Sequence, residues 1–255
     1  MLQFQTTSLN LALLTCSEKR ELLSLLEERE RRKARRKFYD MYPDTGALRR
    51  ELYPKHMAFF TAGAEHMERC MMAANRVGKT WGVGAYEVTA HLTGKYPAWW
   101  TGRKFDNPVD VWVAGDTSET TRDVIQFNLT GVSGEGGEGS LGHGMIPGDL
   151  IVGKPSTKRG ISGAFDTIRV RHVTGGISKL SFKSYDQGRQ KFQGTKKHVV
   201  WLDEEPSIDV YEECVLRLTA TSPGDENGLM ICTFTPLLGL SKVALKFLPD
   251  LAPTA

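Results

Sequence analysis

The sequence predicts an α/β fold with a mostly parallel central sheet flanked by helices, preceded by an N-terminal helical segment. Short apolar runs that suit strands alternate along the chain with longer segments of helical periodicity. Several runs are apolar at consecutive positions, which is typical of parallel strands covered on both faces. At 255 residues, 40% of them hydrophobic, the chain is long enough for one sizeable core.

The first element is a helix that we expect from about residue 17 to residue 39. Residues 15–18 have the Ser/Thr-x-x-Glu form of a capping box, and three leucines between positions 22 and 26 fall on one helical face. Residues 29–37 then hold seven basic residues against one acidic residue. This basic end is either a solvated helix whose charges favour the helix C-terminus, or a patch for DNA phosphates or an acidic partner.

A turn at residues 43–46 separates two parts of the chain. We expect a leader with the basic amphipathic helix at 1–42 and a single domain at 43–255. In this domain we expect strands at 71–74, 109–114, 168–173, 180–185, 198–202 and 229–234, and helices at 83–93, 117–129 and 210–219. The pair Gly175 and Gly176 is a hairpin signal between two of the strands. Residues 131–144 hold seven glycines in fourteen positions, and we expect a mobile surface loop there.

Composition argues against secretion and against a membrane span. The four cysteines, at positions 16, 70, 214 and 232, form no CxxC pair and do not cluster with the histidines, so we expect reduced thiols in a cytosolic protein. No apolar run approaches the ~20 residues that a bilayer span needs. The first 15 residues contain no basic residue and only a short apolar stretch, unlike a signal peptide. The net charge of +3 is uninformative about nucleic acid.

The first chemical motif reads Ala73-Ala74-Asn75-Arg76-Val77-Gly78-Lys79-Thr80. It matches the phosphate-binding loop G-x-x-x-x-G-K-[ST], except that Ala73 replaces the first glycine. Backbone N–H groups of such a loop and of the following helix point at the β-phosphate. Lys79 would place its ammonium against the β- and γ-phosphates, and the Thr80 hydroxyl would ligate Mg²⁺. An expected strand before the motif and an expected helix after it complete the context, so we predict binding of ATP and Mg²⁺.

Two further motifs follow strands. The apolar run at 198–202 leads into Asp203, Glu204 and Glu205, an arrangement typical of a Walker B motif. Asp203 would hold the Mg²⁺ shell, and Glu204, which directly follows it, is favoured over Glu205 to orient and polarise the attacking water. The last expected strand ends in hydroxyl side chains, which in hydrolytic P-loop enzymes can sense the γ-phosphate. These are Thr233 and Thr235, with Phe234 between them.

Taken together, these segments resemble the N-terminal ATPase part of the large terminase subunits of tailed double-stranded-DNA bacteriophages, most of all those of headful-packaging short-tailed phages. The matching segments are 72–80, with an arginine inside the loop, then 185–194, 200–206 and 233–237. The resemblance runs from about residue 18 to residue 248. It implies a P-loop NTPase fold of the ASCE type.

The resemblance also implies a function. Large terminases couple Mg²⁺-dependent ATP hydrolysis to the translocation of double-stranded DNA into the procapsid. We therefore expect a homo-oligomeric ring, thought to be pentameric, on the portal protein, a small terminase subunit as partner, and no membrane association. The expected location is the cytoplasm of the infected bacterial host, with transient docking on the procapsid. The family's nuclease domain has no room after residue 248, so we expect no DNA cleavage by this chain.

Residue roles carried by the resemblance are more specific. Arg76 corresponds to a loop arginine that acts as a charge-stabilising finger. Arg189 is the other candidate, either acting on the ATP of a neighbouring subunit or forming only a structural salt bridge. Residues 233–235 match a motif that couples hydrolysis to domain movement. The family's adenine-contact motif commonly has glutamine, whereas Tyr53 and His56 lie in the corresponding segment here, and a neutral imidazole can still hydrogen-bond adenine.

Other classes of protein remain as alternatives. A small-molecule P-loop kinase would usually lack the Asp203–Glu204 pair and would carry an arginine-rich lid. A nucleotide-regulated DNA-binding adaptor built on the basic helix would bind without hydrolysis. A helicase would need a second motor domain, for which the chain is too short.

Overall fold

A computed structural model describes residues 15–251 of the chain, apart from 135–139, 223 and 238. Within these residues seven strands form one sheet: β1 (Glu68–Met72), β2 (Asp110–Gly115), β3 (Ser156–Thr157), β4 (Phe165–Arg171), β5 (Ile177–Ser184), β6 (Val199–Asp203) and β7 (Leu229–Phe234). The helices are α1 (Cys16–Ala34), α2 (Lys37–Asp40), α3 (Pro54–Ala62), α4 (Tyr86–Thr93), α5 (Ser118–Thr120), α6 (Phe127–Thr130), α7 (Ile208–Leu218) and α8 (Lys242–Phe247). None of the described helices is long and apolar enough to cross a bilayer.

The sheet is mostly parallel, as the sequence predicts. Its spatial order is β1-β7-β6-β2-β5-β4-β3, in which β1, β7, β6, β2 and β5 run parallel and β4 and β3 add an antiparallel edge. The last strand in sequence, β7, lies between β1 and β6. Thr233 of β7 is therefore in register with Met71 on one side and Asp203 on the other. This order brings all three motifs to one edge of the sheet.

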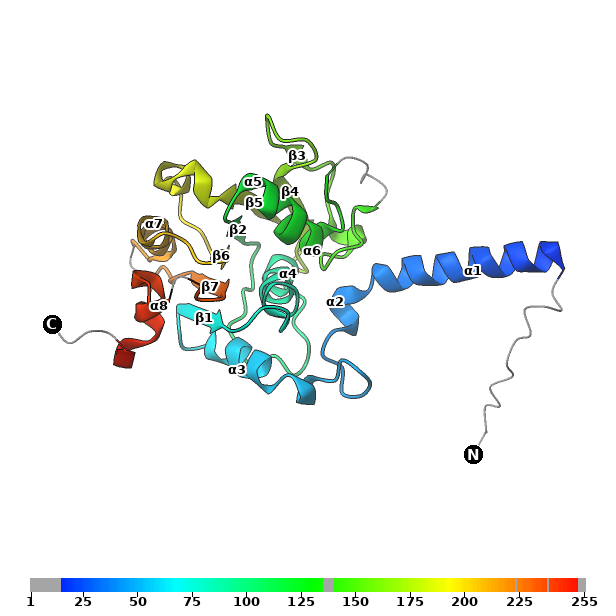
Figure 1. Cartoon of the computed structure of the whole chain (residues 1–255), viewed down its shortest axis with the longest axis horizontal. Helices are drawn as coiled ribbons and strands as arrows, with labels where there is room; N and C mark the ends of the chain where they lie inside the picture. The colour runs from blue at the N-terminus through cyan, green and yellow to red at the C-terminus, as the bar shows by residue number, and fades with distance from the viewer. Residues whose placement is uncertain (1–14, 135–139, 223, 238, 252–255) are drawn as a thin grey trace.

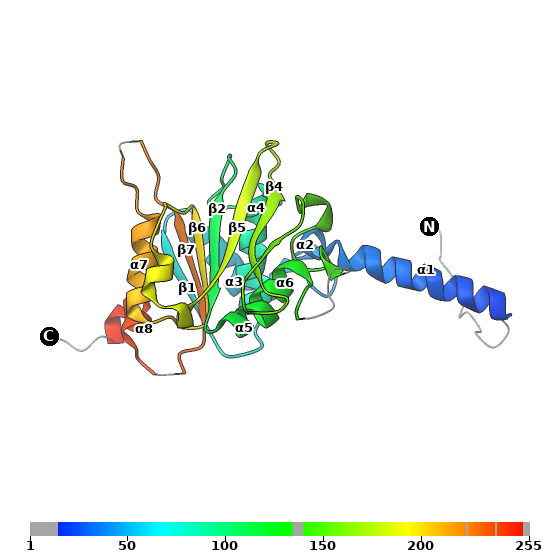
Figure 2. The same cartoon turned by 90° about the horizontal axis from the view of Figure 1, so that it is seen from above.

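Helices cover both faces of the sheet, as Figures 1 and 2 show. One face packs against α3 and α4 in a core rich in aromatic residues, which includes Phe60, Tyr86 and Trp201. The other face packs against α7 and α8 through residues such as Val200 and Tyr211. Val200 and Trp201 are neighbours on β6 and point to opposite faces, as strand geometry requires. Central strands are thus buried on both sides, which explains their unbroken apolar runs.

The predicted elements of the domain are present, with shifted ends around the phosphate-binding motif. The strand expected at 71–74 is β1, which ends at Met72 because the next residues form the loop. The helix expected at 83–93 starts earlier, with a π-helical turn over Lys79–Ala85 that continues into α4. Gly84 permits this path, since a Cβ at that position would lie 2.1 Å from the indole of Trp201.

The predicted N-terminal helix is present, but it is split in two. Its capping box is confirmed: the Thr15 N–H donates to Glu18 Oε2 at 2.8 Å, and the Glu18 N–H donates to Thr15 Oγ1 at 3.3 Å. α1 ends at Ala34, and a two-residue turn separates it from α2. Figures 1 and 2 show α1 projecting away from the sheet and its helices.

The two parts of the leader differ in how far they are buried. On α1 the side chains of Leu23, Leu25 and Leu26 are 45–60% exposed. By contrast, Phe38 of α2 and Tyr42 are buried in the aromatic core. The packed body therefore begins at α2, inside the segment that the sequence assigns to the leader.

The glycine-rich segment is only partly described, since its centre at 135–139 lies outside the described residues. The sequence suggested a mobile surface loop here, but the described ends of the segment pack against α6. The N–H of Gly142 donates to the Thr130 carbonyl, and the N–H of Met145 donates to the Asn128 carbonyl, both at 2.8 Å. A Cβ on Gly144 would lie 2.3 Å from the Thr130 nitrogen, so glycine allows this close approach to the end of α6.

Candidate functional site

The phosphate-binding motif forms a tight loop between β1 and the π-helical turn. Two of its residues have left-handed backbone, Arg76 with φ +64° and Gly78 with φ +87°. Glycine adopts this conformation without strain, whereas arginine does so at some cost. The N–H of Gly82 donates to the Gly78 carbonyl at 2.7 Å and starts the helix. The loop thus ends at a helix N-terminus whose free N–H groups suit an anion.

The side chain of Lys79 folds back onto the start of this loop. Its side chain is largely buried, and Nζ donates to the carbonyls of Ala73 and Ala74, both at 3.0 Å. Nζ also donates to Thr235 Oγ1 at 2.7 Å. The first and third sequence motifs therefore meet at this ammonium group.

Asp203 joins the second motif to the other two. The Thr80 hydroxyl donates to Asp203 Oδ1 at 2.9 Å, and the Thr233 hydroxyl donates to the same oxygen at 2.6 Å. Trp201 Nε1 donates to Thr233 Oγ1 at 2.7 Å, which directs the threonine proton at the carboxylate. Asp203 is only 3% exposed, and this burial raises its pKa to about 7, while the hydrogen bonds from Thr233 and Thr80 act in the opposite direction.

The pair of Thr80 and Asp203 fits a magnesium ion. Mg²⁺ prefers oxygen ligands and is usually held by one or two carboxylates together with water and substrate phosphates. The Thr80 hydroxyl, directly after Lys79, and the Asp203 carboxylate already lie within hydrogen-bonding distance of each other. Both predicted metal residues are therefore brought together by the fold.

Glu204 faces open space beside this pair. It is exposed and has a left-handed φ of +64°, and its N–H donates to the Thr233 carbonyl at 3.0 Å. With Asp203, Asp116 and Thr120 it lines a pocket of about 250 Å³ where β2 and β6 end. A water or a phosphate group would have room next to its carboxylate.

Glu205 has different surroundings. Its Oε1 accepts a hydrogen bond from the Ser241 hydroxyl, and its Oε2 is buried. Ser241 also caps the N-terminus of α8 by accepting from the Ala244 N–H at 3.0 Å. Glu205 is thus engaged with the C-terminal helix, away from the pocket that Glu204 lines.

Tyr185 is a site residue whose role sequence reasoning missed. It follows β5 directly, and its hydroxyl lies 3.0 Å from the Asp203 carbonyl and 3.1 Å from the Glu204 carbonyl. A third carbonyl, that of Ala114 at the end of β2, lies at 3.2 Å. Burial raises the pKa of Tyr185, so the hydroxyl keeps its proton and donates it. The signal was its place just after a strand that ends beside the acidic motif.

His56 lies beneath the loop and not at its open side. Tyr42 donates its hydroxyl proton to the Gly82 carbonyl at 2.8 Å, so it accepts from His56 Nδ1 at 2.7 Å. A Cβ on Gly78 would lie 3.3 Å from His56 Cε1, and the Tyr53 ring lies 5.3 Å from the imidazole centre to centre. Burial lowers the pKa of His56. Tyr42 is a second supporting residue that the sequence did not indicate.

The two candidate finger arginines differ in their contacts. Arg76 is exposed on the loop and forms no ion pair within the described part of the chain. Arg189 Nε donates to Glu213 Oε2 at 2.9 Å, and the Glu213 side chain on α7 is 2% exposed while that of Arg189 is 52% exposed. Within this chain the structure therefore joins Arg189 to α7 and not to the loop.

Thr233 and Phe234 at the end of β7, and Thr235 directly after it, alternate between the two faces of the sheet. Thr233 and Thr235 point to the side of Asp203 and Lys79, as their hydrogen bonds show. Phe234 points to the opposite face and is fully buried against α7 and α8. The strand thus links the site to the second core.

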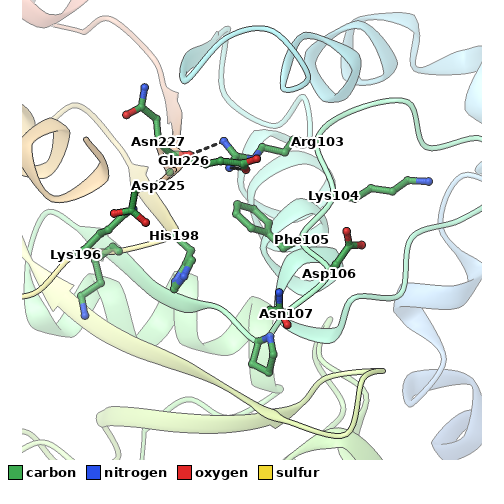
Figure 3. A pocket seen from close by; sticks show the side chains of 13 residues that line it. Arg103, Lys104, Phe105, Asp106, Asn107, Lys196, His198, Asp225, Glu226 and Asn227 are labelled. Atoms are coloured by element: carbon green, nitrogen blue, oxygen red, sulfur yellow. Dashed lines mark hydrogen bonds and ion pairs between the residues drawn. The ribbon is translucent and has the colours of Figure 1, made fainter. Parts of the chain in front are cut away.

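A second polar pocket, of about 360 Å³, lies at the opposite end of the sheet (Figure 3). Arg103 pairs with Glu226 at 2.6 Å, and Lys196 pairs with Asp225 at 2.7 Å. These pairs tie the loop before β7 to the segments before β2 and β6. The phosphate, metal and acid motifs all lie at the other end, where the strands finish.

Comparison of the sequence with known proteins identifies a family that shares these motifs. The family model described as "Terminase large subunit, T4likevirus-type, N-terminal" matches residues 70–254, which include all three motifs. The large terminase subunit of Salmonella phage P22 is 38% identical in an alignment that covers 93% of this chain and 47% of that protein. The chain thus spans about half the length of this curated relative.

Two solved structures show a weaker likeness. The HK97 bacteriophage large terminase is 17% identical, with a TM-score of 0.49 over 79% of this chain and 37% of that chain. The large terminase of a thermophilic bacteriophage in complex with ADP is 11% identical, with a TM-score of 0.44 over 79% of this chain and 50% of that chain. Likeness at this level carries no weight here. The family model covers most of the chain. This chain belongs to the terminase large subunit family.

Proposed function

We propose that this chain binds Mg·ATP and hydrolyses it as the ATPase part of a viral DNA-packaging motor. The observation that carries the proposal is the meeting of Lys79, Thr80, Asp203 and Thr235 at one edge of the sheet, beside the exposed Glu204. These are the groups that phosphoryl transfer to water requires, since its catalysis rests on positioning and on charge stabilisation. Membership of the terminase large subunit family supports the same function.

The loop would hold the triphosphate. Its N–H groups and the helix N-terminus would face the β-phosphate, and Lys79 would exchange the carbonyls of Ala73 and Ala74 for phosphate oxygens. Thr80 and Asp203 would hold Mg²⁺, which when bound supplies neutralising charge to the phosphates. We propose that Tyr53 and His56 contribute to the ATP site, with the buried His56 acting mainly by supporting the loop from beneath.

Glu204 would perform the proton chemistry. Its carboxylate orients and polarises a water molecule for in-line attack on the γ-phosphorus. The new bond forms as the bond to the bridging oxygen breaks, which leaves ADP and inorganic phosphate. The pocket next to Glu204 provides room for this water, whereas Glu205 is engaged with Ser241.

Arg76 is our candidate for stabilising the charge that develops on the γ-phosphate. It lies on the loop itself, its side chain forms no ion pair among the described residues, and a finger of this kind is worth roughly 10³–10⁵ in rate. The role of Arg189 on a neighbouring subunit's ATP stays a prediction. Its bond with the buried Glu213 supports the structural alternative.

Loss of the γ-phosphate on hydrolysis would change the contacts of Lys79 and Asp203, and β7 would transmit this change to the rest of the domain. Thr235 contacts the phosphate-binding lysine and Thr233 contacts the metal-binding aspartate. Phe234 anchors the same strand in the core formed with α7 and α8. A shift of Lys79 on hydrolysis therefore acts directly on this strand.

The partners follow from family membership. We propose double-stranded DNA as the translocated substrate, the portal protein of the procapsid as the docking site, and a small terminase subunit as a further partner. The active form would be a homo-oligomeric ring, a pentamer by family resemblance, in the cytoplasm of the infected bacterium. DNA contact would be mainly to phosphates and strongly dependent on salt.

The test is Mg·ATP hydrolysis by the purified chain over a range of protein concentrations. Glu204→Gln should abolish hydrolysis and leave ATP binding intact, while the matched variant Glu205→Gln should retain activity. A rise of specific activity with concentration would show that a neighbouring subunit contributes a group. Equal activity of Glu204→Gln and wild type would refute the proposed role, and phosphate transfer to a nucleoside or metabolite would favour the kinase alternative.

A further inference from the structure

Among the described residues, no α-helix covers the outward face of β4 and β5, and a 3-10 helix at Arg189–Phe192 reaches only Lys183 near the end of β5. Figure 2 shows α7 over the strands β6 and β7, while β4 and β5 lie beyond it. Trp112 of β2 faces α7 and is in register with Ser181 of β5, which is in register with Thr167 of β4. These pairs place the odd-numbered residues of β4 and β5 on the α7 side of the sheet. The apolar even-numbered ones, Ile168, Val170, Leu180 and Phe182, are buried in the aromatic core on the other side.

This uncovered face carries a row of exposed cations. Arg169 and Arg171 of β4 and Lys179 of β5 are all exposed. None of the three forms an ion pair with a residue in the described ranges. Arg169 and Lys179 are directly opposite each other in the antiparallel register. We call these three residues the basic ribbon.

Such a row is unfavourable for the isolated strand pair. Like charges directly opposite each other across two strands destabilise the pairing. The carboxylate next to Lys179 in register is that of Asp110, and it is bound by Lys197 at 2.5 Å. The charge of the ribbon is therefore not compensated by the described part of the chain and calls for an anionic partner.

We infer that the basic ribbon binds the phosphate backbone of duplex DNA. This inference rests on the proposed function, in which double-stranded DNA is the translocated substrate. Duplex DNA offers one negative charge per ~1.7 Å of its axis, so a row of cations along a strand meets several phosphates at once. The neighbouring hydroxyls of Thr167 and Ser181, 3.4 Å apart, suit phosphate oxygens too. A flat face of this kind contacts the backbone and does not read bases.

The ribbon lies toward the start of β5, in register with the start of β2, and β5 runs from there to the catalytic edge. β5 carries Lys179 and ends at Ser184, and the next residue is Tyr185, whose hydroxyl donates to the Glu204 carbonyl. A DNA duplex on the ribbon would therefore contact the strand whose far end leads into Tyr185, which holds the Glu204 carbonyl.

The test is the salt dependence of binding to a mixed-sequence duplex. The variant Arg169→Gln/Arg171→Gln/Lys179→Gln is compared with wild type and with Lys19→Gln/Lys104→Gln/Lys242→Gln, which removes the same charge from exposed sites elsewhere. Each phosphate contact contributes about 0.9 to the slope of log affinity against log salt. The ribbon variant should therefore lose a slope of about 2.7, and the control should lose much less. Between about 50 and 200 mM salt, wild-type affinity should fall about 40-fold more than that of the ribbon variant.

The outcomes separate this inference from the proposed function. A ribbon variant with the slope of wild type, or with the same loss as the control, overturns the inference, as does a wild-type chain that binds no duplex. Glu204→Gln tests hydrolysis alone and should keep the wild-type slope. If hydrolysis fails in wild type while the ribbon effect on DNA binding is present, the proposed function falls and the ribbon stands. A melting midpoint of the ribbon variant close to that of wild type confirms that it is folded.

Discussion

Thr235 Oγ1 lies 2.7 Å from Lys79 Nζ, although the two residues are 156 positions apart in the chain. Two residues earlier, on β7, Thr233 donates to Asp203 at 2.6 Å. Since β7 lies between β1 and β6, the end of this strand and the residue that follows it contact both Asp203 and Lys79. The hydroxyls of this strand are therefore part of the site and not only of the sheet.

Replacing Thr235 by valine should slow hydrolysis. The change removes the hydroxyl that orients the Lys79 ammonium and keeps the shape of the side chain. A hydrogen bond to a charged group is worth about 1.5–3 kcal/mol, so kcat should fall roughly tenfold to hundredfold. Thr235→Ser keeps the hydroxyl and should stay near wild type. Steady-state kinetics decide this, and a valine variant as active as wild type would show that the bond is incidental.

Tyr185→Phe should lower kcat with little change in KM. The hydroxyl supports the carbonyl of Glu204, a residue that is held in left-handed backbone. Without it the Glu204 carboxylate should be less well placed for the attacking water, while the nucleotide contacts of Lys79 remain. Tyr39→Phe removes an exposed hydroxyl elsewhere and serves as the control. A fall in ATP affinity with unchanged kcat would contradict this role.

Much of the fold and the core of the site follow from the sequence because their signals are local. The strands are short apolar runs, and the residues Lys79, Thr80 and Asp203 belong to motifs whose chemistry requires those residue types. The fold then brings these motifs together, because the carboxyl ends of parallel strands share one edge.

Other features depend on partners that are distant in sequence. Tyr185 and Tyr42 act through backbone carbonyls, which leave no mark in the sequence. The break between α1 and α2 contains no glycine or proline, and the residue that packs directly after it, Phe38, contacts the distant Tyr86 with ring centroids 5.1 Å apart. The early start of the helix after the loop depends on Gly84 beneath Trp201.

Glu87→Gln should strongly destabilise the fold. Arg69 of β1 and Glu87 of α4 form a buried ion pair at 2.7 Å that ties together the two elements flanking the phosphate-binding loop. Removing one partner of a buried pair leaves the other charge uncompensated and typically costs about 3–5 kcal/mol. The exposed pair of Arg122 and Asp123 offers a control, since Asp123→Asn should cost at most about 1 kcal/mol. Urea unfolding measures both, and equal effects would contradict the argument.

The free energy of unfolding should fall as the pH drops below about 6.5. Burial lowers the pKa of four histidines in the folded chain, His56, His91, His172 and His198. In the unfolded chain these histidines bind protons at a pKa of about 6.5. Each proton that the unfolded chain binds and the folded chain does not lowers the unfolding free energy by about 1.4 kcal/mol per pH unit.

Asp203 opposes this trend. Its folded pKa of about 7 lies above the unfolded value of about 3.9, so between these values the folded chain binds the extra proton and gains stability as the pH falls. Urea midpoints measured with EDTA from about pH 7.5 to about pH 5 should therefore drop more steeply for Asp203→Asn than for wild type. Parallel curves for the two proteins would mean that Asp203 is already ionised across this range.

Two chains shortened from the N-terminus should differ in stability, because α1 contributes little to the unfolding free energy and the residues after it contribute much. A chain that starts at residue 36 lacks α1, whose leucines are exposed, and should keep nearly all of its unfolding free energy. A chain that starts at residue 43 also loses the buried Phe38 and Tyr42, and loss of a single buried aromatic side chain costs about 3–5 kcal/mol. It should also bind ATP more weakly, because the Tyr42 hydroxyl holds Gly82 and His56 beneath the loop. Equal stability and ATP affinity of the two shortened chains would instead place the domain boundary at residue 42, where the sequence suggested it.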